Sequence, residues 1–156
     1  MNDRSWRKEE AVAPALDFET LAAMVRGCPF HEWLGVELIS LDETGIVIRM
    51  PWRVEFVSDP DRGYAHGGVL ASLIDLAADY AIAARLGRGA PTVDMRVDYH
   101  RAAMPGPLTA RATVIKAGGT LATAEAHIFN ESDELVASGR ALFLTRAGSE
   151  TKERKA

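Results

Sequence analysis

Two carboxylates in an otherwise uncharged stretch are the first residues of this chain whose types and spacing could do chemistry. Asp75 and Asp79 are four residues apart, and no Lys, Arg or Glu occurs between Gly67 and Ala84. Residues at i and i+4 share one helix face, so burial and mutual repulsion raise the pKa of at least one carboxyl group. Such a group is a candidate general base. Asp75 is the stronger candidate, because Asp79 is better explained as the partner of an arginine or the cap of a loop.

A histidine and two glycines, His66, Gly67 and Gly68, stand at the start of this stretch. Glycines let the backbone approach a bound group closely, and the first turn of a helix offers unpaired N–H donors at the positive end of its dipole. The segment outlines an oxyanion site, although a plain tight turn capped by the histidine is the alternative. Asp75 is eight residues beyond Gly67, about 12 Å along a helix. If both act on one reacting group, Asp75 must come from a second subunit across a two-fold interface.

Periodicity predicts the elements that must position these residues. Asp17 can cap a helix that ends at Gly27, and apolar residues at helical spacing continue from about Gly68 to Leu86. Alternation between Val36 and Trp52 predicts a hairpin that turns at LDETG (41–45). Four further strands are expected near residues 92–100, 108–116, 121–129 and 135–145, joined by short connections. Because helices do not alternate with strands, we expect an α+β fold, an antiparallel sheet packed on one long helix.

The predicted long helix and the strand at 92–100 each have two distinct faces. On a helical wheel one apolar side of the long helix should face the sheet, and it comprises Leu70, Leu73, Ile74, Ala77, Tyr80, Ala81 and Ala84. Ser72, Asp75 and Asp79 lie opposite, but Ala71, Leu76, Ala78, Ile82 and Ala83 share their side. Because these neighbours are apolar, we expect this side of the helix to be covered as well, for example by a second subunit. In the strand at 92–100, alternation places Thr92 with Asp94 and Arg96, away from Val93, Met95, Val97 and Tyr99.

The bulk composition bounds the class of protein. A chain of 156 residues with 47% apolar residues is expected to form one domain over 1–156, with an ordered core at about 15–146 and tails at 1–13 and 147–156. A net charge of −4 disfavours a nucleic-acid partner. The charged N-terminus and the lack of a long apolar run predict a cytoplasmic protein without membrane contact. Cys28 is the only cysteine and the four histidines are dispersed, so we expect no disulfide and no metal.

Longer motifs carry a family resemblance. The segment HGGVLASLID (66–75), followed by an alanine-rich helix, by PTVDMRVDYHRAAMPGPLTARATVIKAGGTLATAEAHI and by LVASGRALFLT, resembles the PaaI-like acyl-CoA thioesterases of the hotdog superfamily. The similarity covers about residues 30–145. It implies a hotdog fold, in which an antiparallel sheet wraps one long helix, and a homodimer that often pairs again into a homotetramer. It implies hydrolysis of an acyl-CoA thioester without a cofactor.

The resemblance also implies roles for individual residues. Asp75 matches the general base or nucleophile of that family, and the Gly67 amide matches the group that polarises the thioester carbonyl. Thr92 matches a residue that helps to hold the water, while His66 orients the loop. Gly68 and Tyr80 are expected to contact substrate. The acyl pocket is expected to depend on the packing of Phe30, Trp33, Leu34, Phe56 and Tyr80.

Other features keep alternatives open. Many relatives carry an asparagine six residues before the histidine, where this chain has Pro60 between two aspartates. A non-catalytic protein that binds acyl-CoA is therefore the second hypothesis, and a hotdog dehydratase or hydratase ranks below it. A serine hydrolase is set aside, because no serine lies in a G-x-S-x-G elbow. Arg101, Arg111 and Lys116 could meet coenzyme A phosphates, although a solvated surface charge is the better explanation of each one alone.

Overall fold

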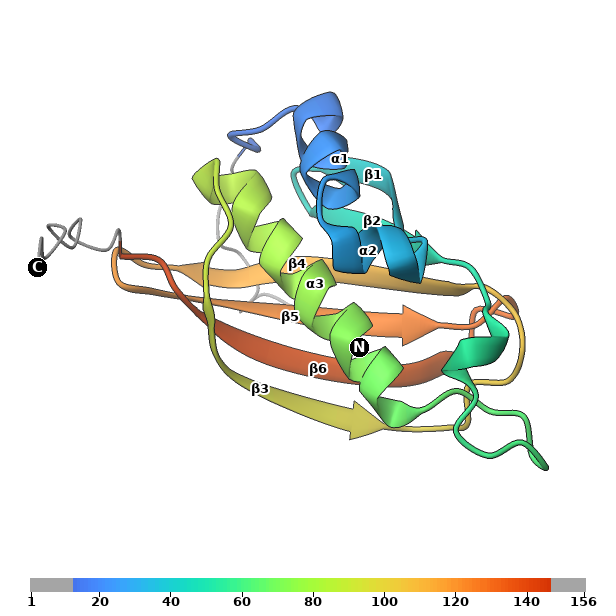
Figure 1. Cartoon of the computed structure of the whole chain (residues 1–156). Coiled ribbons are helices and arrows are strands. Elements are labelled where there is room, and N and C mark those ends of the chain that lie inside the picture. Colours follow the sequence, from blue (N-terminus) through green and yellow to red (C-terminus); the bar gives the residue numbers. More distant parts are fainter. Residues whose placement is uncertain (1–12, 147–156) are drawn as a thin grey trace, which may run out of the picture.

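The fold is a single antiparallel sheet that packs against one long helix, as a computed structural model of residues 13–146 shows (Figure 1). The six strands have the order β1-β2-β4-β5-β6-β3, so β1 and β3 form the two edges. The elements are α1 (Phe18–Arg26), α2 (Pro29–Leu34), β1 (Glu37–Asp42), β2 (Gly45–Met50), a 3₁₀ turn (Val54–Phe56), α3 (Gly67–Leu86), β3 (Thr92–Tyr99), β4 (Leu108–Ala117), β5 (Leu121–Phe129) and β6 (Leu135–Leu144). The predicted α+β hotdog architecture is confirmed.

Local sequence explains the N-terminal helices. Asp17 caps α1 by accepting a hydrogen bond from the Thr20 N–H at 2.8 Å, as predicted, and Gly27 follows its last residue. Helix α2 was not predicted, because six residues are too few to show a helical period. It ends at Gly35, whose φ of 73° favours glycine and whose added Cβ would lie 2.9 Å from Pro51.

The hairpin is tighter than the sequence indicates. Strands β1 and β2 pair as far as Asp42 and Gly45, so only Glu43 and Thr44 form the turn within the predicted LDETG segment. The Asp42 side chain accepts from the N–H groups of Thr44 and Gly45, which stabilises the turn locally.

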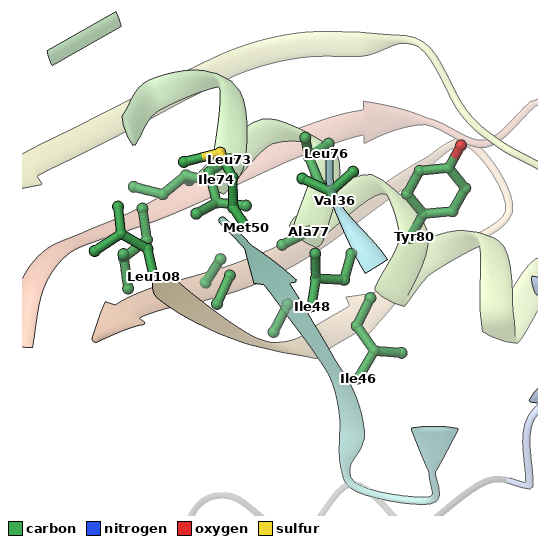
Figure 2. Close-up of a cluster of buried hydrophobic side chains, with 14 of the residues drawn as sticks. Val36, Ile46, Ile48, Met50, Leu73, Ile74, Leu76, Ala77, Tyr80 and Leu108 are labelled. Carbon is green, nitrogen blue, oxygen red and sulfur yellow. The ribbon is translucent and has the colours of Figure 1, made fainter. Parts of the chain in front are cut away.

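Helix α3 is buried on more than one side. The seven residues expected to face the sheet are all buried, and Figure 2 shows the β2 side chains Ile46, Ile48 and Met50 gathered with Leu73, Ile74 and Ala77. Leu76, Ala78, Ile82 and Ala83 are also buried, but this chain covers them itself. The expected cover of these four is confirmed, but this chain supplies it and not a second subunit. Along the middle of the helix, the residues left partly exposed are Ala71, Ser72, Asp75 and Asp79, which we call the open strip.

The helix approaches the sheet closely at Gly139 of β6. A Cβ added at this glycine would lie 2.7 Å from the Ile74 side chain and 2.7 Å from the Arg96 carbonyl oxygen. This contact leaves no room for a side chain at position 139, next to the residue that precedes Asp75.

Strand β3 contains an irregularity that changes which way Thr92 points. Register with β6 pairs Asp94 with Leu142 but Thr92 with Phe143, so Val93 is an extra residue. Phe143 is buried on the helix side of the sheet, and Thr92 therefore shares that side. The prediction that Thr92 and Asp94 face the same way is wrong, because a β-bulge interrupts the alternation.

The predicted tails fall almost entirely on residues 1–12 and 147–156, which lie outside the described part of the chain. Between residues 13 and 146, no helix has the length and apolar character needed to cross a lipid bilayer.

Candidate active site

Asp75 and Thr92 come together from different elements. The Thr92 hydroxyl donates a hydrogen bond to Asp75 Oδ1 at 2.8 Å, so β3 orients a carboxylate that α3 supplies. Asp75 is partly buried in the open strip, and Thr92 is exposed. Within residues 13–146 no hydrogen bond is formed by Asp75 Oδ2. One carboxylate oxygen is thus held in place while the other can accept a proton from a bound water.

Asp79 has a different role. Its Oδ1 accepts a hydrogen bond from the Ala90 N–H at 3.0 Å, which ties the loop between α3 and β3 to the helix. Burial raises the pKa of Asp79, the Ala90 N–H lowers it, and the charge of Asp75 raises it further. The explanation of Asp79 as a loop cap is confirmed, and the prediction that one carboxyl group has a raised pKa is met here.

The turn that starts α3 leaves one amide open. His66 Nδ1 accepts from the Gly68 N–H at 2.8 Å, and the His66 carbonyl accepts from the Val69 N–H at 3.0 Å. The His66 N–H donates to the Phe56 carbonyl at 2.7 Å. Among the described residues the Gly67 N–H has no partner. The histidine is therefore the helix cap, and the Gly67 N–H is free to bind a developing negative charge.

Tyr99 contacts this turn, and sequence reasoning did not assign it to the site. Its hydroxyl donates to the Gly67 carbonyl at 3.0 Å, and a Cβ added at Gly67 would lie 3.3 Å from its ring. The alternation of β3 already placed Tyr99 on the same face as Met95 and Val97, which is the helix side. The alternation therefore predicted on which face of the strand Tyr99 lies, but not that its side chain contacts Gly67.

Tyr80 lies away from the open strip. Its side chain is buried, and its hydroxyl donates to the Met24 carbonyl at 3.1 Å and lies 3.4 Å from His31 Nδ1. Burial, together with the charges of Asp79 and Cys28, raises the pKa of Tyr80 to about 12. It joins the α1–α2 corner to α3, so the structure does not bring it beside Asp75 as a substrate contact.

His31 joins α2 to Tyr80 of α3. Its ring packs edge-on against Tyr80 with centroids 5.5 Å apart. Burial lowers the pKa of His31, whereas the Val25 backbone and the charge of Asp75 raise it. Helix α2 therefore lies within electrostatic range of the candidate base.

Two aromatic side chains of α2 remain half-exposed. Phe30 and Trp33 are 49% and 45% exposed, and their rings stack with centroids 6.2 Å apart. Trp33 also packs edge-on against Phe56 at 5.8 Å, and Phe56 in turn holds the His66 amide. Leu34, Phe56 and Tyr80 are buried, so Phe30 and Trp33 are the members of the expected pocket set that remain open to a ligand.

The loop before His66 contributes no side-chain amide at Pro60. Asp59 Oδ1 accepts from the Asp61 and Arg62 N–H groups and closes a local turn around the proline. Of the basic residues considered for phosphate binding, Arg101 pairs with Glu134 at 2.5 Å and Arg111 with Asp133 at 2.7 Å, while Lys116 is exposed.

Comparison with known proteins agrees with this fold. Residues 62–137 match the sequence profile of the thioesterase superfamily. A protein of that superfamily, solved by X-ray crystallography, is 47% identical and has a TM-score of 0.81, covering 82% of this chain and 97% of its own. The Escherichia coli PaaI protein from the phenylacetic acid degradation operon is 28% identical with a TM-score of 0.75, covering 85% and 94%. The medium/long-chain acyl-CoA thioesterase YigI of Escherichia coli is 28% identical over 74% of this chain and 84% of its own.

The architecture and these similarities define a thioester hydrolase of the hotdog class. The chain belongs to the thioesterase superfamily, as a PaaI-like member with the hotdog fold.

Proposed function

We propose that the protein hydrolyses an acyl-CoA thioester, with Asp75 as general base and the Gly67 N–H as oxyanion donor. Water attacks the thioester carbonyl carbon while Asp75 removes its proton, and the carbonyl oxygen gains the negative charge. Collapse of the intermediate breaks the C–S bond and releases coenzyme A as a thiolate, which then takes up a proton. The observation that carries the proposal is the pair formed by the Thr92-held carboxylate and the unpaired Gly67 N–H.

The two groups act on one substrate when they belong to different subunits. They are separated by about 12 Å of helical rise in one chain, which exceeds the reach of a single thioester carbonyl and its water. A two-fold dimer brings Asp75 of one protomer near the partner's Gly67. The open strip and the free edge of β3, where Val93 is 56% exposed, support an interface there. Pairing of two dimers into a homotetramer is part of the same proposal.

The proposed acyl group is apolar and larger than acetyl. Phe30 and Trp33 offer half-exposed rings on α2, which carries His31 toward Asp75. The relative YigI is named for medium and long acyl chains, which supports the same substrate class. A thiol-release assay over acetyl-, decanoyl-, palmitoyl- and phenylacetyl-CoA tests this. The double variant Phe30→Ala/Trp33→Ala should lose kcat/KM on the larger substrates and keep it on acetyl-CoA, and an equal loss on all four would contradict the acyl assignment.

Asp75→Asn tests the base directly. The amide keeps the shape and the bond from Thr92 but cannot take a proton, so kcat should fall by about 10²–10⁴-fold. Asp79→Asn is the matched control on the same face of α3, because an asparagine oxygen still accepts from Ala90, and its kcat should stay near that of the wild type. Undiminished hydrolysis by Asp75→Asn would rule out the assigned role.

The Gly67 donor can be removed with a proline. The first position of a helix tolerates proline, and His66 has the extended backbone, with φ −62° and ψ 136°, that a residue before proline prefers. Gly67→Pro removes the N–H, whereas Gly67→Ala keeps it and introduces the same Cβ beside Tyr99. We expect kcat of the proline variant to be about 10²–10³-fold below that of the alanine variant. Equal rates would exclude the Gly67 amide as the donor.

The second candidate is a protein that binds acyl-CoA without turnover. It is favoured by the loop at Pro60, which offers no amide side chain where relatives have one. Release of free thiol by the wild type at a rate that falls in Asp75→Asn would eliminate it, and binding without release would establish it.

A further inference from the structure

We propose that Tyr99 is a positioning residue for hydrolysis, which fixes the first turn of α3 so that the Gly67 N–H stays directed at the substrate carbonyl. This inference rests on the proposed function, since it concerns the orientation of the donor named there. Tyr99 does not touch the reacting atoms in this scheme and acts through the backbone of Gly67.

One peptide unit is held at both of its ends. The unit that joins Gly67 to Gly68 consists of the Gly67 carbonyl and the Gly68 N–H. The Tyr99 hydroxyl donates to that carbonyl at 3.0 Å, and His66 Nδ1 accepts from that N–H at 2.8 Å. Rotation of this unit would break both hydrogen bonds at once.

The two side chains also explain why both positions are glycine. A Cβ at Gly67 would lie 3.3 Å from the ring and hydroxyl of Tyr99, and a Cβ at Gly68 would lie 3.0 Å from His66 Nδ1. Two successive glycines would otherwise leave the turn free to adopt many conformations. The hydrogen bonds from Tyr99 and His66 replace the restraint that side chains at these positions would give.

The same bonds determine which amide is available. His66 Nδ1 occupies the Gly68 N–H and the His66 carbonyl occupies the Val69 N–H, so of these three first-turn amides only that of Gly67 lacks a partner among residues 13–146. The Gly67 N–H belongs to the preceding peptide unit, which shares the Gly67 Cα with the Gly67–Gly68 unit, so a shift of that Cα after loss of the Tyr99 bond displaces the donor. Preorganised donors contribute to catalysis only when they are aimed at the position of the developing oxyanion.

Strand β3 holds Tyr99 in place. Tyr99 pairs with Ala137 of β6 at the end of the strand, and its side chain is still 54% exposed beside the turn. The same strand therefore positions Thr92 beside Asp75 at its start and Tyr99 beside Gly67 at its end. Both candidate catalytic groups of one chain are therefore oriented by the same strand.

Tyr99→Phe tests the role, because it removes the hydroxyl and keeps the ring. We expect kcat to fall by about 10- to 100-fold with KM unchanged. A misdirected oxyanion donor stabilises the transition state less, whereas it leaves substrate binding as it was. Tyr64→Phe is the matched control, because the Tyr64 hydroxyl makes no hydrogen bond in the described chain although it lies two residues before His66. Its kcat and KM should match the wild type.

A double-mutant cycle and amide exchange separate positioning from a structural role. Tyr99→Phe and His66→Ala act on the same peptide unit, so the loss of kcat in the double variant should be smaller than the product of the two single losses. Hydrogen exchange at the Gly68 N–H should accelerate in Tyr99→Phe while the thermal midpoint stays within about 2 °C.

The outcomes distinguish this inference from the proposed function. Wild-type kcat and unchanged Gly68 exchange in Tyr99→Phe, with Asp75→Asn inactive, would overturn the role of Tyr99 and leave the proposed function intact. Undiminished hydrolysis by Asp75→Asn would instead overturn the proposed function. A rise in KM with kcat unchanged in Tyr99→Phe would also contradict positioning, because it indicates a direct contact with substrate.

Discussion

The Thr92 hydroxyl donates to Asp75 Oδ1 at 2.8 Å although the two residues are seventeen positions apart, and the contact joins the edge strand β3 to the central helix. A carboxylate on an exposed helix face samples several rotamers, each with its oxygens in a different place. The bond from Thr92 selects one of them. It also leaves Asp75 Oδ2 as the oxygen that can take the proton of a bound water.

Thr92→Val should lower kcat by about 10-fold, because Asp75 then loses the donor that orients it. Thr92→Ser retains a hydroxyl at the same place and should recover most of the activity. Steady-state kinetics of both variants on one acyl-CoA substrate measure this. Similar rates for the valine and serine variants would show that the hydroxyl does not orient the base.

Mixing two inactive variants tests whether the site is shared. In a heterodimer of Asp75→Asn with Gly67→Pro, one site combines the intact aspartate of one chain with the intact glycine of the other. Random exchange of protomers should therefore restore about one quarter of wild-type activity. The mixture is unfolded, refolded and compared with each variant treated alone. Failure of the mixture to exceed the separate variants, although heterodimers form, would place both groups in one chain.

Asp79→Asn should stabilise the protein at neutral pH. Because burial raises the pKa of Asp79, the folded state holds this proton more tightly than the unfolded chain. That contribution is fully present below pH 3.8, the unperturbed value, and is lost as the pH rises through the folded pKa. The neutral asparagine avoids the loss and still accepts from Ala90.

Urea unfolding at pH 7 and pH 4.5, at one protein concentration, measures the difference. The advantage of Asp79→Asn over the wild type should shrink at the lower pH. Asp61→Asn, in an exposed turn, is the control and should change little at either pH. An advantage for Asp79→Asn that is the same at both pH values would contradict the burial of this carboxyl group.

Gly139→Ala should destabilise the fold by about 1–3 kcal/mol, because the new methyl group would lie 2.7 Å from both Ile74 and the Arg96 carbonyl oxygen. Gly119→Ala, where a Cβ meets no atom within 4 Å, is the control and should stay within about 0.5 kcal/mol of the wild type. Unfolding free energies of both variants test the close approach of α3 to β6. Equal stability of the two variants would show that helix and sheet are farther apart.

Residues with a clear period were predictable from the sequence. Helix α3, the hairpin and the three C-terminal strands came from the spacing of apolar residues, and Asp17 marked the start of α1. Helix α2 was missed because Pro29–Leu34 is shorter than two turns. The second buried side of α3 was recognised at Leu76 and Ile82, but a wheel cannot tell whether a partner or the same chain supplies the cover.

The candidate site was only partly visible. Asp75 and the His66–Gly68 turn were predictable as candidate catalytic groups, because they lie in an otherwise apolar stretch. Thr92 was selected by family resemblance. The contact between Thr92 and Asp75 depends on a bulge at Val93, and a strict two-residue period excludes a bulge by construction. The role of Tyr99 depends on where β3 ends relative to Gly67, which is a distance that no local pattern encodes.

The extra residue at Val93 has a consequence for how this edge strand tolerates change. Before the bulge an even-numbered residue, Thr92, faces the helix, whereas after it the even-numbered residues Asp94, Arg96 and Asp98 face away from it. These three outward-facing positions can therefore vary without changing the direction of Thr92. A regular strand that kept Val93 would turn Thr92 away from the helix, whereas deletion of Val93 would leave Thr92 directly before Asp94 and still on the helix side. One inserted residue thus lets an edge strand with a polar outer face present the Thr92 hydroxyl to Asp75 on the helix side of the sheet.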